Sequence, residues 1–183
     1  MEESLIKPSD IIDYWFSKKS KQFWFASTPT IDKEIKSRYE SIWEQAASGN
    51  FNFWRETANG SVALIIILDQ FPLNMFRSEA KSFRTENMAI EVSLNAINNG
   101  FDEEMDNEKL LFLFMPLMHS ENIEHQNLQV YLFDKYNFNL EFSKHHRDLV
   151  KKFGRFPHRN EILGRKSTTE ELDYLLSDNA FRG

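Results

Sequence analysis

A basic stretch at residues 151–166, KKFGRFPHRNEILGRK, holds the residue types best suited to bind an anion. It contains six Lys and Arg residues, although the whole chain has a net charge of -6. Two Gly and one Pro interrupt it, which predicts a defined loop between two helices. Guanidinium groups bind phosphate or carboxylate through paired hydrogen bonds, and glycines let backbone N–H groups approach the same anion. The residues of this loop predicted to bind a ligand are Arg155, Arg159 and Asn160, with Arg165 beside them and His158 as a candidate base.

A structural role for the same loop is the alternative. Arg and Asn side chains there would satisfy carbonyl groups at helix ends, and His158 would order the loop. A cluster of like charges repels itself unless a counter-charge or a ligand is present, and this favours the binding interpretation.

A second candidate group surrounds the sequence His119-Ser120-Glu121, with His125 four residues after Glu121. An imidazole that titrates near neutral pH predicts His119 as a general base, with Glu121 as the carboxylate that orients it. Two His and one Glu also suit zinc, but the order differs from the HExxH pattern, so the predicted site contains no metal. The structural alternative is that Ser120 caps a helix and Glu121 interacts with its dipole.

A third group follows the most apolar helix. Asp69 and Gln70 end that helix, and Asn74 and Arg77 come soon after. Asp69 is a candidate catalytic carboxylate, and the other three are predicted to bind the ligand. The structural alternative is an Asp69–Arg77 pair across the turn at Pro72.

These groups must be positioned by helices, because no segment alternates apolar and polar residues in the manner of a strand. Three- and four-residue apolar spacing predicts about eight helices, with Thr85 as the cap of the fourth, Gly154 as the end of the seventh, and overlapping capping-box patterns from Ser167 and Thr168 to Glu170 and Glu171 at the start of the last. We expect them near residues 9–16, 31–48, 62–71, 86–98, 109–118, 121–136, 141–153 and 170–176. Pro72 is expected to end or kink the third. Short connections favour antiparallel hairpins in a single helical domain over residues 1–183.

Composition limits the classes of function. With no Cys, the chain has no disulfide, thiolate nucleophile or Cys-ligated zinc, which suits a cytoplasmic protein. A pI near 5.4 argues against nucleic acid as a partner. The longest apolar run, Val62–Leu68, is too short to span a bilayer, and the first ten residues lack a secretory signal pattern.

Three blocks of the sequence resemble those of a bacterial family, domain-of-unknown-function family 924. They are ILDQFPLNMFRSEAKSF, FMPLMHSENIEHQ and HRDLVKKFGRFPHRNEILGRKSTTEEL. The resemblance implies an all-α, tetratricopeptide-like right-handed array of helices, and it implies no known activity. The family pattern has Arg where this chain has Leu73, so any ligand contact made by that Arg is absent here.

The combined hypothesis is one polar pocket built from the turn after Leu68, the His119 junction and the 154–165 loop. It would bind a small anionic ligand, without a cofactor, and in an enzyme it would perform a hydrolysis or a group transfer. The sequence leaves open whether the protein is an enzyme. The alternative is a non-catalytic scaffold that presents a groove, lined in part by the four Trp residues, to a peptide or partner protein.

Overall fold

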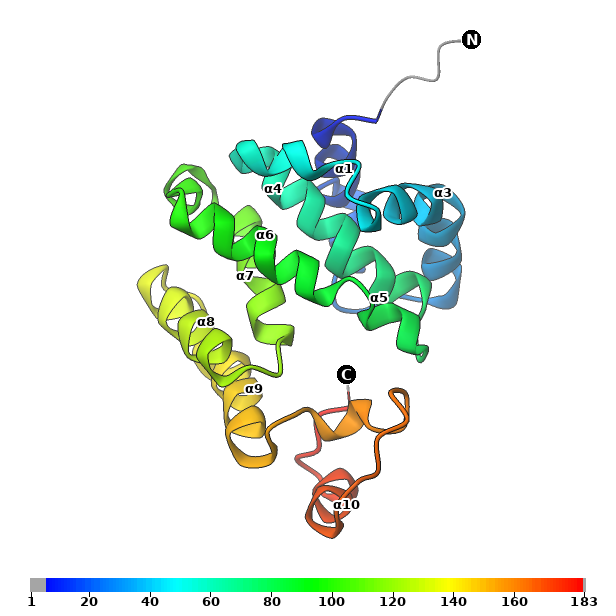
Figure 1. Ribbon diagram of the computed structural model, residues 1–183, viewed down its shortest axis with the longest axis vertical. Coiled ribbons are helices and arrows are strands. Elements are labelled where there is room, and N and C mark those ends of the chain that lie inside the picture. Colours follow the sequence, from blue (N-terminus) through cyan, green and yellow to red (C-terminus); the bar gives the residue numbers. More distant parts are fainter. Residues whose placement is uncertain (1–5, 183) are drawn as a thin grey trace. The chain divides into compact units, whose positions relative to one another are not determined.

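The computed structural model describes residues 6–182, and every regular element in that range is helical (Figure 1). The helices of eight residues or more in that range lie at or close to the eight predicted positions, except that the third, expected over residues 62–71, already begins at Ala58. They are α1 (Pro8–Trp15), α3 (Pro29–Ala47), α4 (Ala58–Ile65), α6 (Glu86–Asn98), α7 (Asn107–His119), α8 (Ile123–Lys135), α9 (Leu140–Phe153) and α10 (Thr169–Leu176). The predicted all-α class is confirmed, while the tetratricopeptide-like arrangement stays a prediction.

Shorter helical segments connect these helices. They are α2 (Lys18–Lys21), η1 (Asn52–Glu56), η2 (Ile66–Gln70), α5 (Phe71–Met75), η3 (Ala80–Phe83), η4 (Phe101–Glu104) and η5 (Pro157–Arg159). No helix in the described range is both long enough and apolar enough to cross a membrane.

The chain divides into two compact units. Unit 1 comprises the chain up to Arg77 together with Lys81–Pro116, and unit 2 comprises Ser78–Ala80 and the chain from Leu117 onward. The division therefore falls inside α7, directly after Pro116. The single domain expected over residues 1–183 stays a prediction, and each unit is described by itself.

The central run of unit 1 excludes one of the two effects expected of Pro72, the end of the helix. The helix does not end there: α4 passes through the π-helical turn η2 into α5, so that Pro72 lies within a continuous run. A proline cannot donate to the carbonyl four residues earlier, which is that of Leu68. The Thr85 hydroxyl donates to this carbonyl over 2.5 Å, and Trp43 Nε1 donates to the same hydroxyl over 2.9 Å. This buried relay satisfies the group that Pro72 leaves unpaired.

The relay also explains why Thr85 caps α6 differently from the expectation. Thr85 is the N-cap residue of α6, but its hydroxyl makes no capping bond within that helix, because it donates to the Leu68 carbonyl and its oxygen accepts from Trp43 Nε1. Around this relay α3 packs on α5, and α4 contacts both α1 and α6. Trp15, Trp43 and Trp54 are buried in unit 1, so they cannot line an open groove.

Unit 2 is built on the hairpin of α8 and α9, which lie side by side (Figure 1). Asn122 caps α8 and Asn139 caps α9, each through a side-chain oxygen that accepts a backbone N–H. Ser120, the predicted cap of α8, instead accepts from the N–H of Asn122. Gly154 ends α9 at φ 70°, as predicted, in the left-handed conformation that favours glycine.

A small apolar cluster holds the basic loop onto this hairpin. Leu149 and Val150 of α9 are buried with Phe156 of the loop. Partly buried side chains extend the cluster from α8, α9, α10 and the segment after α10: Ile123, Phe153, Tyr174 and Phe181. The loop is thereby fixed at its apolar residue, while its charged residues face other partners.

Candidate functional site

The predicted polar groups of unit 1 lie in and after the π-helical turn. Asp69 and Gln70 belong to η2, and both are buried. Gln70 Nε2 donates to Asp69 Oδ2 over 2.6 Å. Single π-helical turns often occur at functional sites, because they redirect side chains from the regular helical positions. The roles predicted for Asp69 and Gln70 stay predictions.

Asn74 and Arg77 converge on a residue that the sequence patterns do not indicate. Asp32, in the first turn of α3, accepts from Arg77 Nε at 2.9 Å and from Asn74 Nδ2 at 2.9 Å. Ser27 donates to the same carboxylate over 2.7 Å. Burial alone would raise the pKa of Asp32, but these hydrogen bonds outweigh it and hold the pKa below its usual value. The partner of Arg77 is therefore Asp32, 45 residues away in sequence, which no local pattern indicates.

The first counter-charge to the basic loop in unit 2 is Glu121. Its carboxylate accepts hydrogen bonds from both terminal nitrogens of Arg165, at 2.6 and 2.8 Å, and from the backbone N–H of Phe156, at 2.8 Å. Burial would raise the pKa of Glu121, but the hydrogen bonds from Arg165 and Phe156 lower it below its usual value. The carboxylate predicted to orient a catalytic base is thus occupied in holding the loop.

The second counter-charge is Glu171 of α10. Arg155 reaches it with two hydrogen bonds, at 2.6 and 2.8 Å, and also donates to the carbonyl of Lys166 over 2.9 Å. Glu171 accepts the N–H of Thr168 as well, which completes the predicted capping box. The hydrogen bond from Arg155 is the main cause that lowers the pKa of Glu171 to about 2.

Arg159 and Asn160 are buried, and both make contacts that support the loop. Arg159 donates to the carbonyl of His119 over 2.8 Å and lies 4.8 Å from the ring centre of Phe156. Asn160 accepts from Arg165 at 3.0 Å and donates to Ser167 at 3.0 Å. Arg155 and Arg159 therefore each donate to a backbone carbonyl, as the structural alternative expects, whereas the Asn160 side chain bonds side chains of the loop region, and the ligand-binding roles of all three stay predictions.

His158 is mostly buried, and the Phe156 and Phe181 rings lie 5.7 and 4.9 Å from its ring. Its Nδ1 has no hydrogen-bond partner among residues 6–182. Burial is the main cause that lowers its pKa to about 4, and the charge of Arg159 adds to the effect. His158 is consequently an uncharged imidazole at neutral pH.

The residues around His119 form separate contacts. Ser120 Oγ lies 2.9 Å from His125 Nδ1, and the carbonyl of His119 accepts from Arg159. Glu121 is held by Arg165 as described. Within the described range, no group of three or more His, Asp or Glu side chains is arranged to hold a metal ion.

A concavity of about 690 Å³ opens on unit 2 beside the loop. Its lining is Pro157, His158, Glu161, Arg165, Lys166, Ser167, Leu172, Leu175 and Arg182. Of the predicted site residues only His158 belongs to this lining, with Arg165 from the same loop. Lys166 lies at the end of the basic stretch, outside the predicted set, and Arg182 belongs to no local motif that indicates a site.

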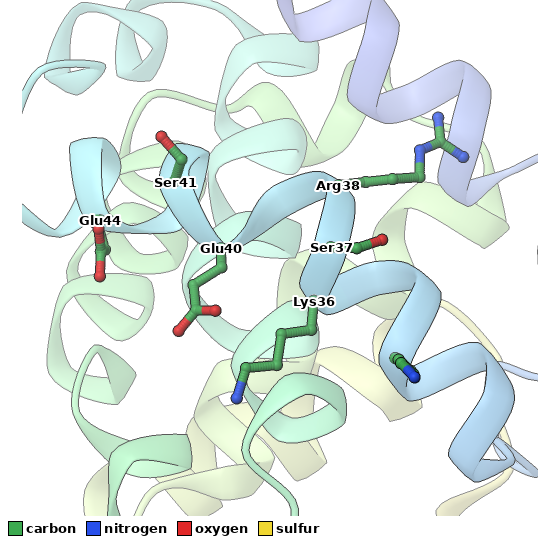
Figure 2. A pocket seen from close by; sticks show the side chains of 7 residues that line it. Lys36, Ser37, Arg38, Glu40, Ser41 and Glu44 are labelled. Atoms are coloured by element: carbon green, nitrogen blue, oxygen red, sulfur yellow. The ribbon is translucent and has the colours of Figure 1, made fainter.

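Unit 1 carries a depression of about 480 Å³, lined only by residues of α3. Figure 2 shows the side chains of Lys36 and Glu40 on one side of the helix and that of Arg38 directed away from them. All of its lining side chains are polar and come from one helix. It contains no convergent group from a second element, so we assign it no function.

The candidate residues thus form two sets. Asp69, Gln70, Asn74 and Arg77 belong to unit 1, while His119, Glu121, Arg155, His158, Arg159 and Asn160 belong to unit 2. Within unit 2 the structure joins Glu121 to the 154–165 loop. The single pocket that would combine both sets stays a prediction.

Comparison with known proteins identifies a bacterial family of unknown function. A family model described as a bacterial protein of unknown function (DUF924) matches residues 11–179. The structure of a protein of unknown function from Agrobacterium tumefaciens is similar, with a TM-score of 0.86 and 35% sequence identity. The match covers 92% of this chain and 96% of that chain. No curated protein matches this chain.

Proposed function

The chain belongs to the DUF924 family of bacterial proteins of unknown function. For this member of the family, we propose that the concavity of unit 2 binds a small anionic ligand. The observation that carries the proposal is the positive charge in the lining that no carboxylate of the described residues neutralises. Arg165 is neutralised by Glu121, whereas Lys166 and Arg182 make no ion pair with any described residue. Two uncompensated cations beside one exposed carboxylate, Glu161, give the concavity a positive balance.

The remaining lining suits an organic anion. Leu172, Leu175 and Pro157 supply apolar surface, and Ser167 and His158 supply polar atoms. Small-molecule sites generally combine an apolar wall with a few polar groups that fix the orientation of the ligand. The loop that carries several of these groups is held by the Glu121 and Glu171 ion pairs, so the site is largely formed before the ligand binds.

If the ligand is also transformed, the reaction we propose is a hydrolysis or a group transfer with His158 as the base. Its imidazole lines the concavity and is uncharged at neutral pH, and an anion bound beside it would raise its pKa from about 4 toward the range in which a general base is effective. The predicted base His119 does not belong to this lining. Replacement of His158 by Gln would then leave ligand binding intact and abolish turnover, whereas loss of binding in this variant would refute a purely chemical role.

Binding is tested by thermal unfolding and by amide chemical shifts of the full chain in the presence of a panel of phosphorylated and carboxylic metabolites. A ligand at ten times its Kd stabilises a protein by about 1.4 kcal/mol. We expect stabilisation of the parent and a clearly weaker effect for Lys166→Ala. Lys151→Ala is the matched control, because Lys151 is exposed on α9 and does not line the concavity. Equal stabilisation of all three proteins would refute the proposed site.

A partner-binding scaffold is the second candidate, and exposed apolar residues of α10 favour it. Leu172 and Leu176 lie on one face of the helix and are 50% and 84% exposed. A partner protein retained by the parent and released by Leu176→Glu, with the metabolite panel inactive, would favour this function over small-molecule binding.

A further inference from the structure

The segment after α10 carries one aromatic residue, Phe181, which packs onto unit 2. We call residues 178–182 the strap. Within it, the N–H of Phe181 donates to the Tyr174 hydroxyl over 2.7 Å, which ties the segment back to α10. The Phe181 ring centre lies 4.4 Å from that of His146 and 4.9 Å from that of His158. Phe181 therefore sits between a residue of α9 and a residue of the loop.

The position between His146 and His158 suits an aromatic ring, because both histidines are uncharged at neutral pH. Burial lowers the pKa of His146 to about 4, as it does for His158. The Phe181 ring also joins the apolar cluster around Phe156. An apolar side chain packed in this way fixes the backbone of a segment that otherwise makes few contacts.

The residue directly after Phe181 is Arg182, which lines the concavity. Its own side chain is exposed and forms no ion pair with any described residue. Nothing in its own contacts therefore holds it at the site, and its position follows from the seating of Phe181. Ordering the backbone beforehand reduces the entropy that a ligand must overcome when it immobilises the guanidinium.

We propose that Arg182 is the residue that recognises the phosphate or carboxylate group of the ligand, and that Phe181 is its positioning residue. The inference rests on the proposed function and specifies how the site is completed. The planar guanidinium offers two parallel hydrogen bonds to either anion, whereas Lys166 offers a point charge. The strap thus supplies the directional contact, and the loop supplies the rigid wall.

The test is calorimetric titration of the full chain with pyrophosphate and, separately, with citrate. The two probes distinguish recognition of phosphate from recognition of carboxylate. For at least one probe, we expect Arg182→Ala to weaken binding about tenfold or more, because the charge-assisted hydrogen bonds to the anion are lost. Arg182→Lys should recover part of that loss. Phe181→Ala should weaken binding several-fold, although Phe181 does not line the concavity.

The decisive measurement is the double variant. If Phe181 acts through Arg182, the double variant binds no more weakly than Arg182→Ala alone, because the positioned group is already absent. A fully additive loss would overturn the positioning role. Phe181→Leu keeps most of the apolar contact and serves if Phe181→Ala does not fold. Arg147→Ala is the matched control, since Arg147 pairs with Asp148 on α9 and does not line the concavity.

The outcomes separate this inference from the proposed function. If the parent binds the probe, Lys166→Ala weakens that binding and Arg182→Ala leaves it unchanged, the role of Arg182 is overturned and the proposed site is retained. If Phe181→Ala binds the probe with the same affinity as the parent, only the positioning role of Phe181 is overturned. Failure of the parent to bind either probe would overturn the role of Arg182 as an anion-recognition residue. Failure with the whole metabolite panel would overturn the proposed function as well.

Discussion

Replacing Glu121 by alanine removes the carboxylate that holds the basic loop against the start of α8. The substitution leaves the Arg165 guanidinium without its ion-pair partner and the Phe156 N–H without its acceptor. Both charged side chains are about a quarter exposed, at 25% for Glu121 and 24% for Arg165. The pair therefore lies between a surface ion pair and a buried one.

The magnitude follows from that intermediate exposure. Breaking a buried pair by removing one partner costs about 3–5 kcal/mol, and an exposed pair contributes about 0–1 kcal/mol. The lost acceptor of the Phe156 N–H adds about 1 kcal/mol. We expect Glu121→Ala to lower the free energy of unfolding by about 2–3 kcal/mol, or the Tm by about 4–12 °C for a chain of this length.

Urea titration provides the assay, with two probes that report on different parts of the chain. All four Trp residues lie at or before Trp54, so tryptophan fluorescence reports unit 1, whereas far-UV circular dichroism reports all helices. We expect the circular dichroism transition to shift to lower urea in Glu121→Ala. If the two units unfold independently, the fluorescence transition stays in place.

The matched control is Glu170→Ala. Glu170 pairs with Lys152 at 3.1 Å, but the two side chains are 67% and 52% exposed, so the loss should be at most about 0.5 kcal/mol. Glu121→Gln tests the charge, since the amide oxygen still accepts the Phe156 N–H. A Glu121→Ala variant no less stable than Glu170→Ala would refute the assignment of Glu121 as the residue that holds the loop.

Three further predictions concern stability. Thr85→Val removes the hydroxyl of the buried relay and should cost about 2–4 kcal/mol in chemical denaturation, while Thr85→Ser should restore most of it. Gly60→Ala should destabilise strongly in a thermal melt, because an added Cβ would lie 2.1 Å from the carbonyl oxygen of Trp54; an unchanged Tm would refute that packing. Acidification from pH 7 to 5 should destabilise unit 2, because folding depresses the pKa of His146 and of His158 to about 4. The stability that these histidines contribute is present above their unfolded pKa near 6.5 and is lost as the pH falls toward 4. His146→Phe should reduce that pH dependence, and an identical pH profile would contradict the reasoning.

Much of the local structure follows from the sequence. Apolar spacing and capping residues place the eight longer helices, and the Thr168 box and the Gly154 stop appear where the pattern predicts them. These features depend on interactions within a few residues of each other, which a sequence displays directly. Pro72 is the exception. Its effect on the helix depends on a hydroxyl from Thr85, which is distant in sequence.

The candidate site depended far more on tertiary structure. Residue types alone indicated a charged loop in need of counter-charges, and the sequence left open whether protein or ligand provides them. Only the fold shows that Glu121 and Glu171 neutralise Arg165 and Arg155. The same fold brings Lys166 and Arg182 to one concavity. Charge pairing acts through space and is independent of the separation along the chain. The sequence therefore determined which cations are present, and the tertiary structure decided which of them remain available to a ligand.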